Sequence, residues 1–459
     1  RYDYDSNKDL TAQLERYVSW FGTASLSYRD LYNLFYSMRL DQTNMLVNAS
    51  KFRNNPSWSV GGKWNISNEK FFPENSIVGS LALRASYGLA GNIDKSTTPD
   101  MVGEFGKEYS VSSLNILEVK NPANPSLGWE KTYTFNIGLD ATLLDGRMNM
   151  TLDFYNRRSK DLLSSIKNDA TTGWTSFYTN SASMYNRGVE LMLQGKIVKN
   201  KDWEWDAALN FSYNHSKVTD RKYDITPRSA IYSSTILVGR PYRQLTSLRY
   251  GGLDDNGEPT FLKADGSRHG WNEIDNIEYA DLKEEGSLLP PVFGSLSTSL
   301  RWREFTLSAF LTYQLGHKMR LPSPQYSGGL YTEWACEDYR WIEGADNSGK
   351  WVPRLYNGYG GDSWAPANYW NCLNYSDRMI ESANTVRLKS LRLDYDMSKW
   401  LNTLGIRGGS IGVSGENLWA WYANRDNIDP DTVYEDFFGI VTQMRGNQAR
   451  LIVNLNINF

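Results

Sequence analysis

The last nine residues restrict the fold of this chain more than any other stretch. Apolar residues fall at every second position from Leu451 to Phe459, and Asn454, Asn456 and Asn458 lie between them. A period of two describes a β-strand with one apolar face and one polar face. Such a strand ends a soluble β-sandwich, or it spans a membrane in a β-barrel, with the apolar face toward lipid and the final aromatic residue at the interface. The rest of the chain must distinguish these two folds.

The same alternation recurs from one end of the chain to the other. The clearest hairpin has its turn at Asp145-Gly146, a strong turn signal. We predict about fifteen strands, each long enough for a tilted membrane-spanning strand. The predicted strands are 17–28, 31–41, 57–66, 78–90, 132–143, 148–155, 187–198, 203–217, 242–252, 258–264, 292–302, 305–315, 385–397, 410–420 and 451–459. A change of apolar phase near Lys389 and Ser390 predicts a β-bulge there.

The connections between these strands alternate between short and long. Short turns fall near residues 30, 145, 200, 255 and 303, and the long polar connections are 42–56, 91–131, 159–186, 218–240, 265–291, 316–384 and 421–447. Short periplasmic turns and long external loops are typical of outer-membrane barrels, whereas a soluble sandwich gives no reason for this alternation. If Phe459 ends at the periplasmic side, every long loop lies outside and the turn near 255 is periplasmic. The strand count is odd, so the first and last strands run in the same direction and cannot form an antiparallel pair.

Composition excludes several other classes of protein. The net charge is -3 and no run of lysine or arginine occurs, so nothing predicts binding to nucleic acid. The mean hydropathy is -0.54 with no apolar run of about 18 residues, which excludes helical membrane spans but suits a barrel. The histidines, His215, His269 and His317, have no zinc-ligand spacing, and the sequence contains no catalytic constellation. We therefore expect no metal, no cofactor and no enzyme activity.

Two features of the sequence leave alternatives open. Cys336 and Cys372 lie in the same long polar connection, and one disulfide or two free thiols are equally compatible with the sequence. The chain opens on Arg1-Tyr2 without the apolar core of a signal peptide. An exported chain would therefore have lost its signal, or it would begin within a longer protein.

Several short motifs follow one another along the chain. They are Ser57–Glu69, Leu83–Asn92, Asn124–Thr132, Asp153–Tyr155 with Lys160–Leu163, Asn186–Leu191, Val386–Lys389, Gly415–Leu418 and Asp429-Pro430. Each motif is weak alone, but together and in this order they resemble the C-terminal half of the barrel in the SusC/RagA-like TonB-dependent transporters. One departure is Lys63, which is inserted before Trp64 in the first motif.

This resemblance implies an all-β transmembrane antiparallel β-barrel of about 22 strands with long extracellular loops, occluded by an N-terminal plug domain. It implies a place in the outer membrane of a Gram-negative bacterium. Residues 1–459 would form the C-terminal portion of that barrel, with the plug and about seven first strands absent. The implied partners are the TonB complex, acting through the absent N-terminal region, and a SusD-like surface lipoprotein that closes the top as a lid. A dimer of transporter–lipoprotein pairs is a further expectation.

The long connection 316–384 is the best candidate for contact with a substrate or with the lid. It interleaves flat aromatic side chains, which stack on sugar faces, with charged side chains that bind hydroxyl groups. The candidate residues are Tyr331, Trp334, Asp338, Arg340, Trp341, Trp351, Tyr359, Asp362, Trp364 and Trp370. The alternative is that these aromatic residues only hold a long loop folded. Asp254–Glu258 is explained by turn chemistry rather than by a calcium site.

These expectations combine into one functional hypothesis with two alternatives. The first is active, TonB-dependent import of a bulky nutrient, with the aromatic loops favouring an oligosaccharide. The first alternative is the same type of transporter with an oligopeptide as its substrate. The second is a passive porin or surface adhesin, and a large, constantly open conductance of the full-length protein would argue for a pore and against a plug.

Overall fold

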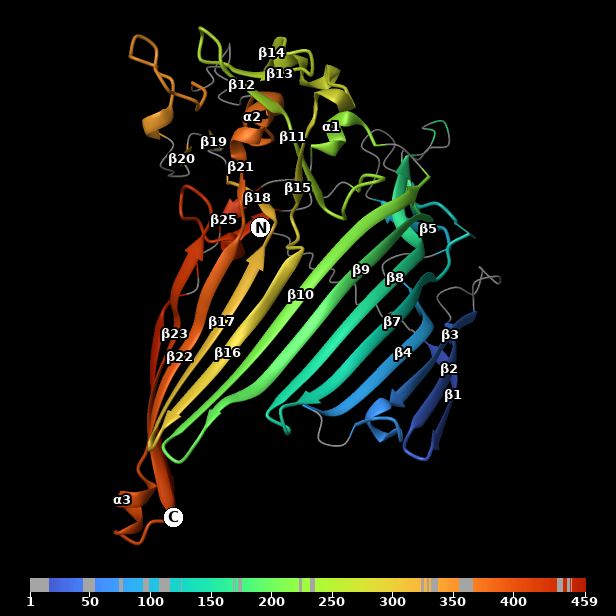
Figure 1. The fold of residues 1–459 in the computed structure, drawn as a ribbon. Helices are drawn as coiled ribbons and strands as arrows, with labels where there is room; N and C mark the ends of the chain where they lie inside the picture. Colours follow the sequence, from blue (N-terminus) through green and yellow to red (C-terminus); the bar gives the residue numbers. More distant parts are fainter. Residues whose placement is uncertain are drawn as a thin grey trace, which may run out of the picture.

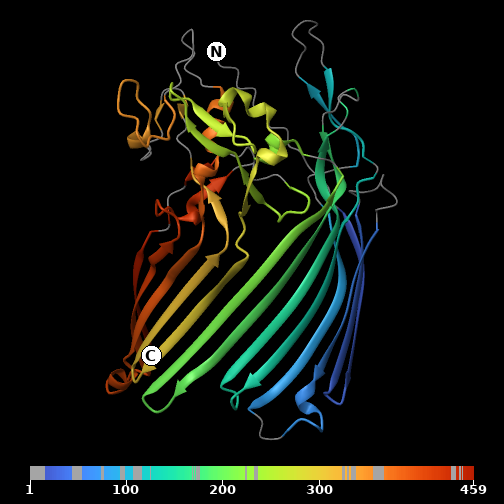
Figure 2. The ribbon, with the colours of Figure 1, turned by 45° about the horizontal axis from the view of Figure 1, so that its top comes forward.

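The computed structural model describes residues 16–43, 54–73, 77–93, 99–106, 116–124, 126–167, 169, 171, 176–222, 225–231, 236–322, 326–327, 330–331, 337–354, 366–435, 441–443, 446 and 448–459. A curved sheet of 13 strands dominates these residues. The short turns gather at one end of the sheet and the long connections at the other (Figure 1). Figure 2 shows the same wall from a second angle, with the long connections toward the viewer.

Strands that are consecutive within this sheet pair antiparallel, and the sheet follows the order of its strands along the chain. In order, the strands are β1 (Tyr17–Tyr28), β2 (Tyr32–Thr43), β3 (Asn54–Asn65), β4 (Val78–Asn92), β7 (Glu130–Leu143), β8 (Met148–Lys167), β9 (Ser176–Lys199), β10 (Trp203–Arg221), β16 (Val292–Trp302), β17 (Phe305–Leu315), β22 (Thr385–Asp396), β23 (Gly408–Tyr422) and β26 (Arg450–Asn458). The predicted all-β antiparallel architecture is confirmed.

The alternation of side chains gives the sheet one apolar face that no other part of the described chain covers. On β26, Val453 is 70% exposed and Leu455 is 59% exposed, although both belong to a regular ladder with β23. Four aromatic side chains, Trp203, Trp302, Phe305 and Tyr395, face one another across neighbouring strands near the short turns, with ring centroids 5.8, 6.1 and 4.8 Å apart. An uncovered apolar band bordered by aromatic residues is the lipid face of a barrel.

The opposite face carries the charges. Nε of Arg84 on β4 lies 2.7 Å from a carboxylate oxygen of Asp140 on β7, and its Nη2 lies 3.1 Å from Asp153 on β8. Gly138 makes this contact possible, because a Cβ there would stand 2.3 Å from the Asp153 carboxylate. Ion pairs that link three neighbouring strands stabilise a wall whose inner face meets water rather than an apolar core.

The predicted turns near 30, 145, 200 and 303 are confirmed. Arg29 and Asp30 have φ values of 51° and 53°, and Leu144 and Asp145 have φ of 55°, the left-handed conformations of tight hairpin turns. The predicted bulge is also present, since the register of β22 against β23 shifts between Leu388 and Ser390. The change of apolar phase in the sequence therefore marks a real extra residue in the ladder.

Two predicted membrane strands, 242–252 and 258–264, are wrong. These residues form β11 (Gln244–Ser247), β12 (Arg249–Leu253) and β13 (Pro259–Leu262), which lie among the long connections (Figure 1). Their apolar side chains alternate because one face packs into a protein core, where Leu248 and Phe261 are fully buried. The turn near 255 is therefore not periplasmic. The described sheet has 13 strands rather than about fifteen, and the odd parity is unchanged.

The predicted long loop 159–186 is wrong over most of its length. β8 continues to Lys167 and β9 already begins at Ser176, and the ladder between them pairs Lys167 with Ser176. Apolar alternation stops earlier because strands beyond the lipid have no apolar partner, whereas backbone pairing continues without one. The ladder accommodates a register shift around Asp161, whose φ is 57°.

The remaining elements are short and lie outside the main sheet. The strands are β5 (Val102–Gly106), β6 (Ile116–Asn121), β14 (Arg268–Gly270), β15 (Lys283–Ser287), β18 (Lys318–Arg320), β19 (Tyr326–Ser327), β20 (Leu330–Tyr331), β21 (Ile380–Ser382), β24 (Val433–Glu435) and β25 (Val441–Gln443). The helices are α1 (Pro227–Ala230), α2 (Ala367–Asn374) and α3 (Ser398–Asn402), with 3-10 turns η3 (Ile66–Asn68), η5 (Trp271–Asn276), η6 (Tyr279–Asp281), η7 (Glu337–Tyr339), η8 (Asp377–Met379) and η9 (Pro430–Thr432). Among the described helices, none has the length and apolar character needed to cross a bilayer.

Candidate functional site

Two long connections, between β10 and β16 and between β17 and β22, fold against each other at the loop end of the sheet. We call the described residues of 225–291 and 316–384 the loop assembly. An isolated parallel bridge joins Leu248 of the first connection to Ser376 of the second. Leu248 and Phe261 from the first connection share one buried cluster with Cys372 and Tyr375 from the second. The two connections therefore have a common hydrophobic core and pack as one unit.

Arg320 ties the two connections together from inside. Its side chain is 2% exposed, and its Nη1 donates to the carbonyl oxygen of Asn374 at 3.1 Å. Nη2 donates across to the other connection, to the carbonyl oxygens of Ile231 at 3.0 Å and Thr246 at 3.1 Å. The guanidinium also lies 4.8 Å from the ring centroid of Tyr375. A planar cation with several fixed donors suits this role better than lysine.

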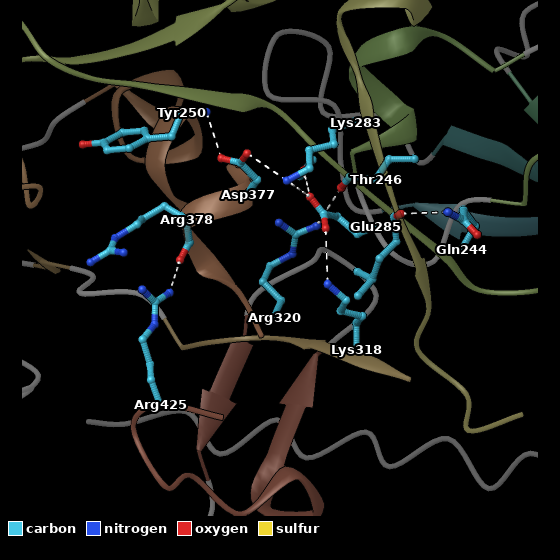
Figure 3. A network of polar contacts seen from close by, with 12 residues as sticks. Gln244, Thr246, Tyr250, Lys283, Glu285, Lys318, Arg320, Asp377, Arg378 and Arg425 are labelled. Atoms are coloured by element: carbon cyan, nitrogen blue, oxygen red, sulfur yellow. Dashed lines mark hydrogen bonds and ion pairs between the residues drawn. The ribbon is translucent and has the colours of Figure 1, made fainter. Parts of the chain in front are cut away.

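A network of ion pairs surrounds Arg320 (Figure 3). Nζ of Lys283 lies 3.1 Å from both Glu285 and Asp377, and Glu285, only 6% exposed in its side chain, also faces Lys318 at 3.7 Å. Burial opposes the charge of Lys283, but its hydrogen bonds to Glu285 and Asp377 outweigh that effect and raise its pKa. Asp377 also accepts the backbone N–H of Tyr250 at 3.0 Å. The buried Glu285 carboxylate is thus compensated by one lysine from each connection, Lys283 and Lys318.

Of the predicted site residues, Trp341 and Trp351 pack within the loop assembly. Trp341 covers Gly257, where a Cβ would lie 2.4 Å from the indole. The ring of Trp351 lies 4.6 Å from the guanidinium of Arg378, and its carbonyl oxygen accepts the Tyr250 hydroxyl at 2.6 Å. Both side chains are half-buried, so part of each ring is still accessible.

Trp370 and Arg340 are buried, at 9% and 8% exposure. Trp370 packs edge-on against Tyr369, whose ring in turn meets Trp271 at 5.6 Å. Asp338 is exposed, on the rim of the same segment. Trp370 and Arg340 are therefore packed inside the assembly. Asp338, Trp341 and Trp351 keep exposed surface that a substrate or lid can reach. Their contact with either stays a prediction.

The other predicted site residues fall on parts of the chain that are not described. Trp334, Cys336, Tyr359, Asp362 and Trp364 lie outside the described residues, and for Tyr331 only the backbone pairing with Tyr326 is described. Cys372 is fully buried, and burial raises the pKa of its thiol to about 12. Since Cys336 lies outside the described residues, the alternatives of one disulfide or two free thiols stay untested.

Within the described residues, no group of three or more His, Cys, Asp or Glu side chains is arranged to hold a metal ion. The carboxylate of Asp254 accepts the backbone N–H groups of Asn256 at 2.9 Å and Glu258 at 2.8 Å, which is turn chemistry. Glu258 pairs with Arg354 at 2.8 Å.

Sequence reasoning missed Arg320, Glu285 and Lys318 because nothing local marks them. Arg320 bonds residues up to 89 positions away, and such pairs leave no periodic signal.

A cavity of about 480 Å³ lies where the end of β10 meets the loop assembly. Its lining is mainly aliphatic and includes two arginines, one glutamate and one tyrosine: Arg221, Ile225, Ile236, Leu237, Val238, Arg240, Thr246, Tyr279, Ala280, Leu282 and Glu284. Nη1 of Arg221 donates to the carbonyl oxygen of Ile236 at 2.9 Å, and Arg240 pairs with Glu284. An apolar cavity with a few fixed polar groups is the usual form of a small binding site.

The motifs noted in the sequence meet one another in space. Arg84 of the second motif pairs with Asp153 of the fourth. Glu130, in the third, accepts the backbone N–H of Leu163 at 2.9 Å, and Lys131 pairs with Asp161 at 2.9 Å. Residues of separate motifs therefore act as contact partners across strands.

Comparison with known proteins agrees with this architecture. The family model described as TonB dependent receptor-like, beta-barrel, matches residues 1–418. TonB-dependent receptor P26 of Formosa agariphila is 27% identical over 471 residues, which cover 96% of this chain and 46% of that relative. TonB-dependent receptor SusC of Bacteroides thetaiotaomicron is 32% identical over 209 residues, covering 44% of this chain and 21% of SusC. The chain spans about half the length of the curated relatives that it matches along most of its length.

Solved structures show the same likeness. The RagAB peptide importer in its closed-closed state is 26% identical with a TM-score of 0.75, covering 96% of this chain and 48% of that one. The structure of the RagAB peptide transporter has a TM-score of 0.76 at 24% identity, over 97% of this chain and 48% of that one. The chain therefore belongs to the TonB-dependent receptor β-barrels of the SusC/RagA type, an outer-membrane family of Gram-negative bacteria whose members are receptors and transporters rather than enzymes.

Proposed function

We propose that the protein containing this chain imports a bulky nutrient across the outer membrane with energy from the TonB complex. The observation that carries the proposal is the loop assembly, in which two long connections share one buried core at the loop end of a family barrel wall. A passive pore needs no such packed structure at its mouth. We also propose that residues 1–459 are the C-terminal portion of the barrel, completed by further strands and a plug.

The proposed partner at the surface is a SusD-like lipoprotein lid. Segment 337–354 presents Tyr339, 48% exposed, and Ile342, 56% exposed, beyond the packed core of the assembly. Two backbone bonds close its base, from Trp341 N–H to the Val352 carbonyl oxygen and from Trp351 N–H to the Tyr339 carbonyl oxygen, each 3.0 Å. Exposed apolar side chains on a closed projection suit contact with another protein. A dimer of transporter–lipoprotein pairs remains a prediction.

For the substrate we favour an oligopeptide. The cavity beside β10 is lined by aliphatic side chains together with Arg221, Arg240 and Glu284, which suits an aliphatic residue flanked by charged or amide groups. The solved structures that resemble the chain include a peptide importer. The aromatic residues Trp351 and Trp370, expected to stack on sugars, are engaged with Arg378 and Tyr369. An oligosaccharide is the second candidate, supported by the exposed rings of Tyr339 and Tyr279.

The experiment compares uptake by whole cells of labelled oligopeptides and labelled oligosaccharides. We expect oligopeptide uptake that requires both this protein and TonB. Uptake should fall when residues 342–350, the tip of segment 337–354, are replaced by a Gly-Gly linker across the closed base of that segment. Substitution of Asp346 by Ala, an exposed change at the same tip, serves as the control. Saccharide uptake alone would favour the second candidate. A large, constantly open conductance of the purified full-length protein would favour a passive pore, and unchanged uptake with surface adhesion lost would favour an adhesin.

A further inference from the structure

A groove of about 630 Å³ lies on the apolar face of the main sheet, next to the short turn between β7 and β8. Its floor contains two small residues in register on neighbouring strands, Gly195 opposite Ala207, with Met148 opposite Gly195 on the other side. Gly195 must be glycine here, because a Cβ would stand 2.8 Å from the carbonyl oxygen of Arg147. The floor is thus lower than the surface around it.

Bulky apolar side chains form the walls of this groove. On one side, Leu193, Leu209 and Leu296 are opposite one another on β9, β10 and β16. On the other side lies Ile197, 53% exposed, which the register between β9 and β10 skips at a β-bulge. A bulge re-aims side chains locally, and here it adds an apolar wall.

The groove has dimensions that match one lipid chain. From Met148 on β8 to Leu296 on β16 the lining crosses three strand spacings, roughly 14 Å at about 4.8 Å each. One leaflet of a bilayer has a hydrocarbon depth of roughly 15 Å. Thr298, opposite Ala207 and outside the lining, accepts the indole N–H of Trp205 through its hydroxyl at 2.8 Å, so this neighbouring polar group already has a partner.

Two opposite charges stand at the turn end of the groove. Asp145 and Arg147 line it, both are exposed, and within the described part of the chain neither side chain has a hydrogen bond or an ion pair. Both belong to the same tight turn, where Gly146 separates them. The phosphate of a zwitterionic phospholipid suits Arg147, and its ammonium group suits Asp145. An anionic headgroup would meet the Asp145 carboxylate as a like charge.

We propose that this groove is a binding site for one phospholipid, with an acyl chain along the floor and a phosphoethanolamine headgroup between Arg147 and Asp145. The proposal rests on the outer-membrane location of the family and is independent of what the protein transports. A lipid seated here would brace β8, β9 and β10 against one another at the membrane boundary.

The test uses the full-length protein, equilibrated with equal amounts of phosphatidylethanolamine and phosphatidylglycerol in mild detergent and examined by native mass spectrometry. Ala207→Phe fills the floor, and Arg147→Gln removes the phosphate partner. Ala24→Phe is the matched control, because Ala24 on β1 is an exposed apolar residue in line with Tyr36 on the same face, away from the groove.

We expect wild type and Ala24→Phe to retain phosphatidylethanolamine in preference to phosphatidylglycerol. Arg147→Gln should reduce that retention by about tenfold, the size of one lost charge-assisted contact. Ala207→Phe should reduce it at least as much, because the added ring occupies the floor of the groove. Arg147→Gln changes an exposed turn residue, so it reports on the site even if Ala207→Phe folds poorly. Retention in Arg147→Gln equal to that in Ala24→Phe, or equal binding of the two lipids to wild type, would overturn the proposal and leave only unspecific annular lipid.

Discussion

Arg387 on β22 and Asp429 in the last long connection form a two-pronged ion pair. Nη1 of Arg387 lies 2.8 Å from Oδ2 of Asp429, and Nη2 bonds Oδ1 of the same carboxylate. Asp431 adds a second carboxylate at 3.0 Å, and the ring of Tyr422 lies 5.3 Å from the guanidinium. The arginine side chain is only 8% exposed. The motif around Val386–Lys389 and the motif Asp429-Pro430 are therefore two halves of one contact.

Arg387→Met should loosen the connection that follows β23. The substitution leaves the carboxylate of Asp429, 16% exposed, without its main partner, and breaking such a pair costs about 3–5 kcal/mol. Hydrogen exchange of residues 423–435 should rise accordingly. The control is Arg392→Met on the same strand, where an exposed arginine pairs with Asp394 and the expected cost is about 1 kcal/mol or less. Equal effects of the two substitutions would contradict this assignment.

Arg320→Met should separate the two halves of the loop assembly. Three buried carbonyl oxygens, of Asn374, Ile231 and Thr246, lose their donor, at about 1–3 kcal/mol for each acceptor left unsatisfied. Limited proteolysis on intact cells should then cut within both connections. Arg268→Met, an exposed arginine of the same assembly, should leave the cleavage pattern unchanged. If Arg320→Met resists protease as wild type does, the guanidinium does not hold the two connections together.

The segment around His317 should be less stable against local opening in mild acid. The side chain is 6% exposed, and burial lowers its pKa below the ordinary value near 6.5, against a smaller opposing effect of Asp431. Below about pH 6.5 the opened segment therefore binds a proton that the closed segment does not, so stability falls as pH falls from 6.5 toward the lowered pKa. The amide of Ala383, which donates to the His317 carbonyl oxygen at 3.0 Å, should exchange faster at pH 5.5 than at pH 8 after correction for intrinsic rates. A His317→Asn variant should show no such difference, and a pH effect that persists in it would assign the change elsewhere.

Gly188→Ala should impair folding of the barrel wall. A Cβ at Gly188 would stand 2.4 Å from the ring of Tyr155 on the neighbouring strand, and overpacking of this kind costs about 1–3 kcal/mol. The fraction of protein that migrates as folded barrel on unheated gels should fall. Tyr155→Leu should restore it only in part, because the Cβ would also stand 2.6 Å from the carbonyl oxygen of Tyr213. Gly22→Ala on β1, with nothing within 4 Å of the new Cβ, is the control. An effect of Gly22→Ala as large as that of Gly188→Ala would show general sensitivity of strand glycines instead.

Sequence patterns located the membrane strands well because each of these strands has an apolar face toward lipid and a polar face toward water. The strands Val292–Trp302 and Phe305–Leu315 have the predicted ends, and the turn between them needs only the left-handed Arg303, with φ of 51°. The same patterns failed for 242–264, where the alternation reflects the protein core around Leu248 and Phe261. A period of two cannot tell lipid from a packed interior, since both select apolar side chains.

The candidate site was only partly accessible to sequence reasoning. The aromatic-rich connection was found, but its described members Trp341 and Trp351 are held by Gly257 and Arg378, which come from other parts of the assembly. Arg320 and Glu285 act through partners far away in the chain, and such contacts follow from tertiary packing rather than from local spacing. The groove beside Gly195 likewise depends on register among four strands.

In the orientation that we propose, the loop assembly lies outside the cell and the short turns lie on the periplasmic side of the outer membrane. Single cysteines at Ser348, on the projection, and at Lys201, in the turn between β9 and β10, test it in a full-length protein with Cys336→Ser and Cys372→Ala. Both positions are exposed, so a membrane-impermeant maleimide reaches whichever one faces the medium. On intact cells Ser348→Cys should be labelled, and Lys201→Cys should be labelled only after the outer membrane is opened. Labelling of Lys201→Cys but not of Ser348→Cys on intact cells would contradict the account.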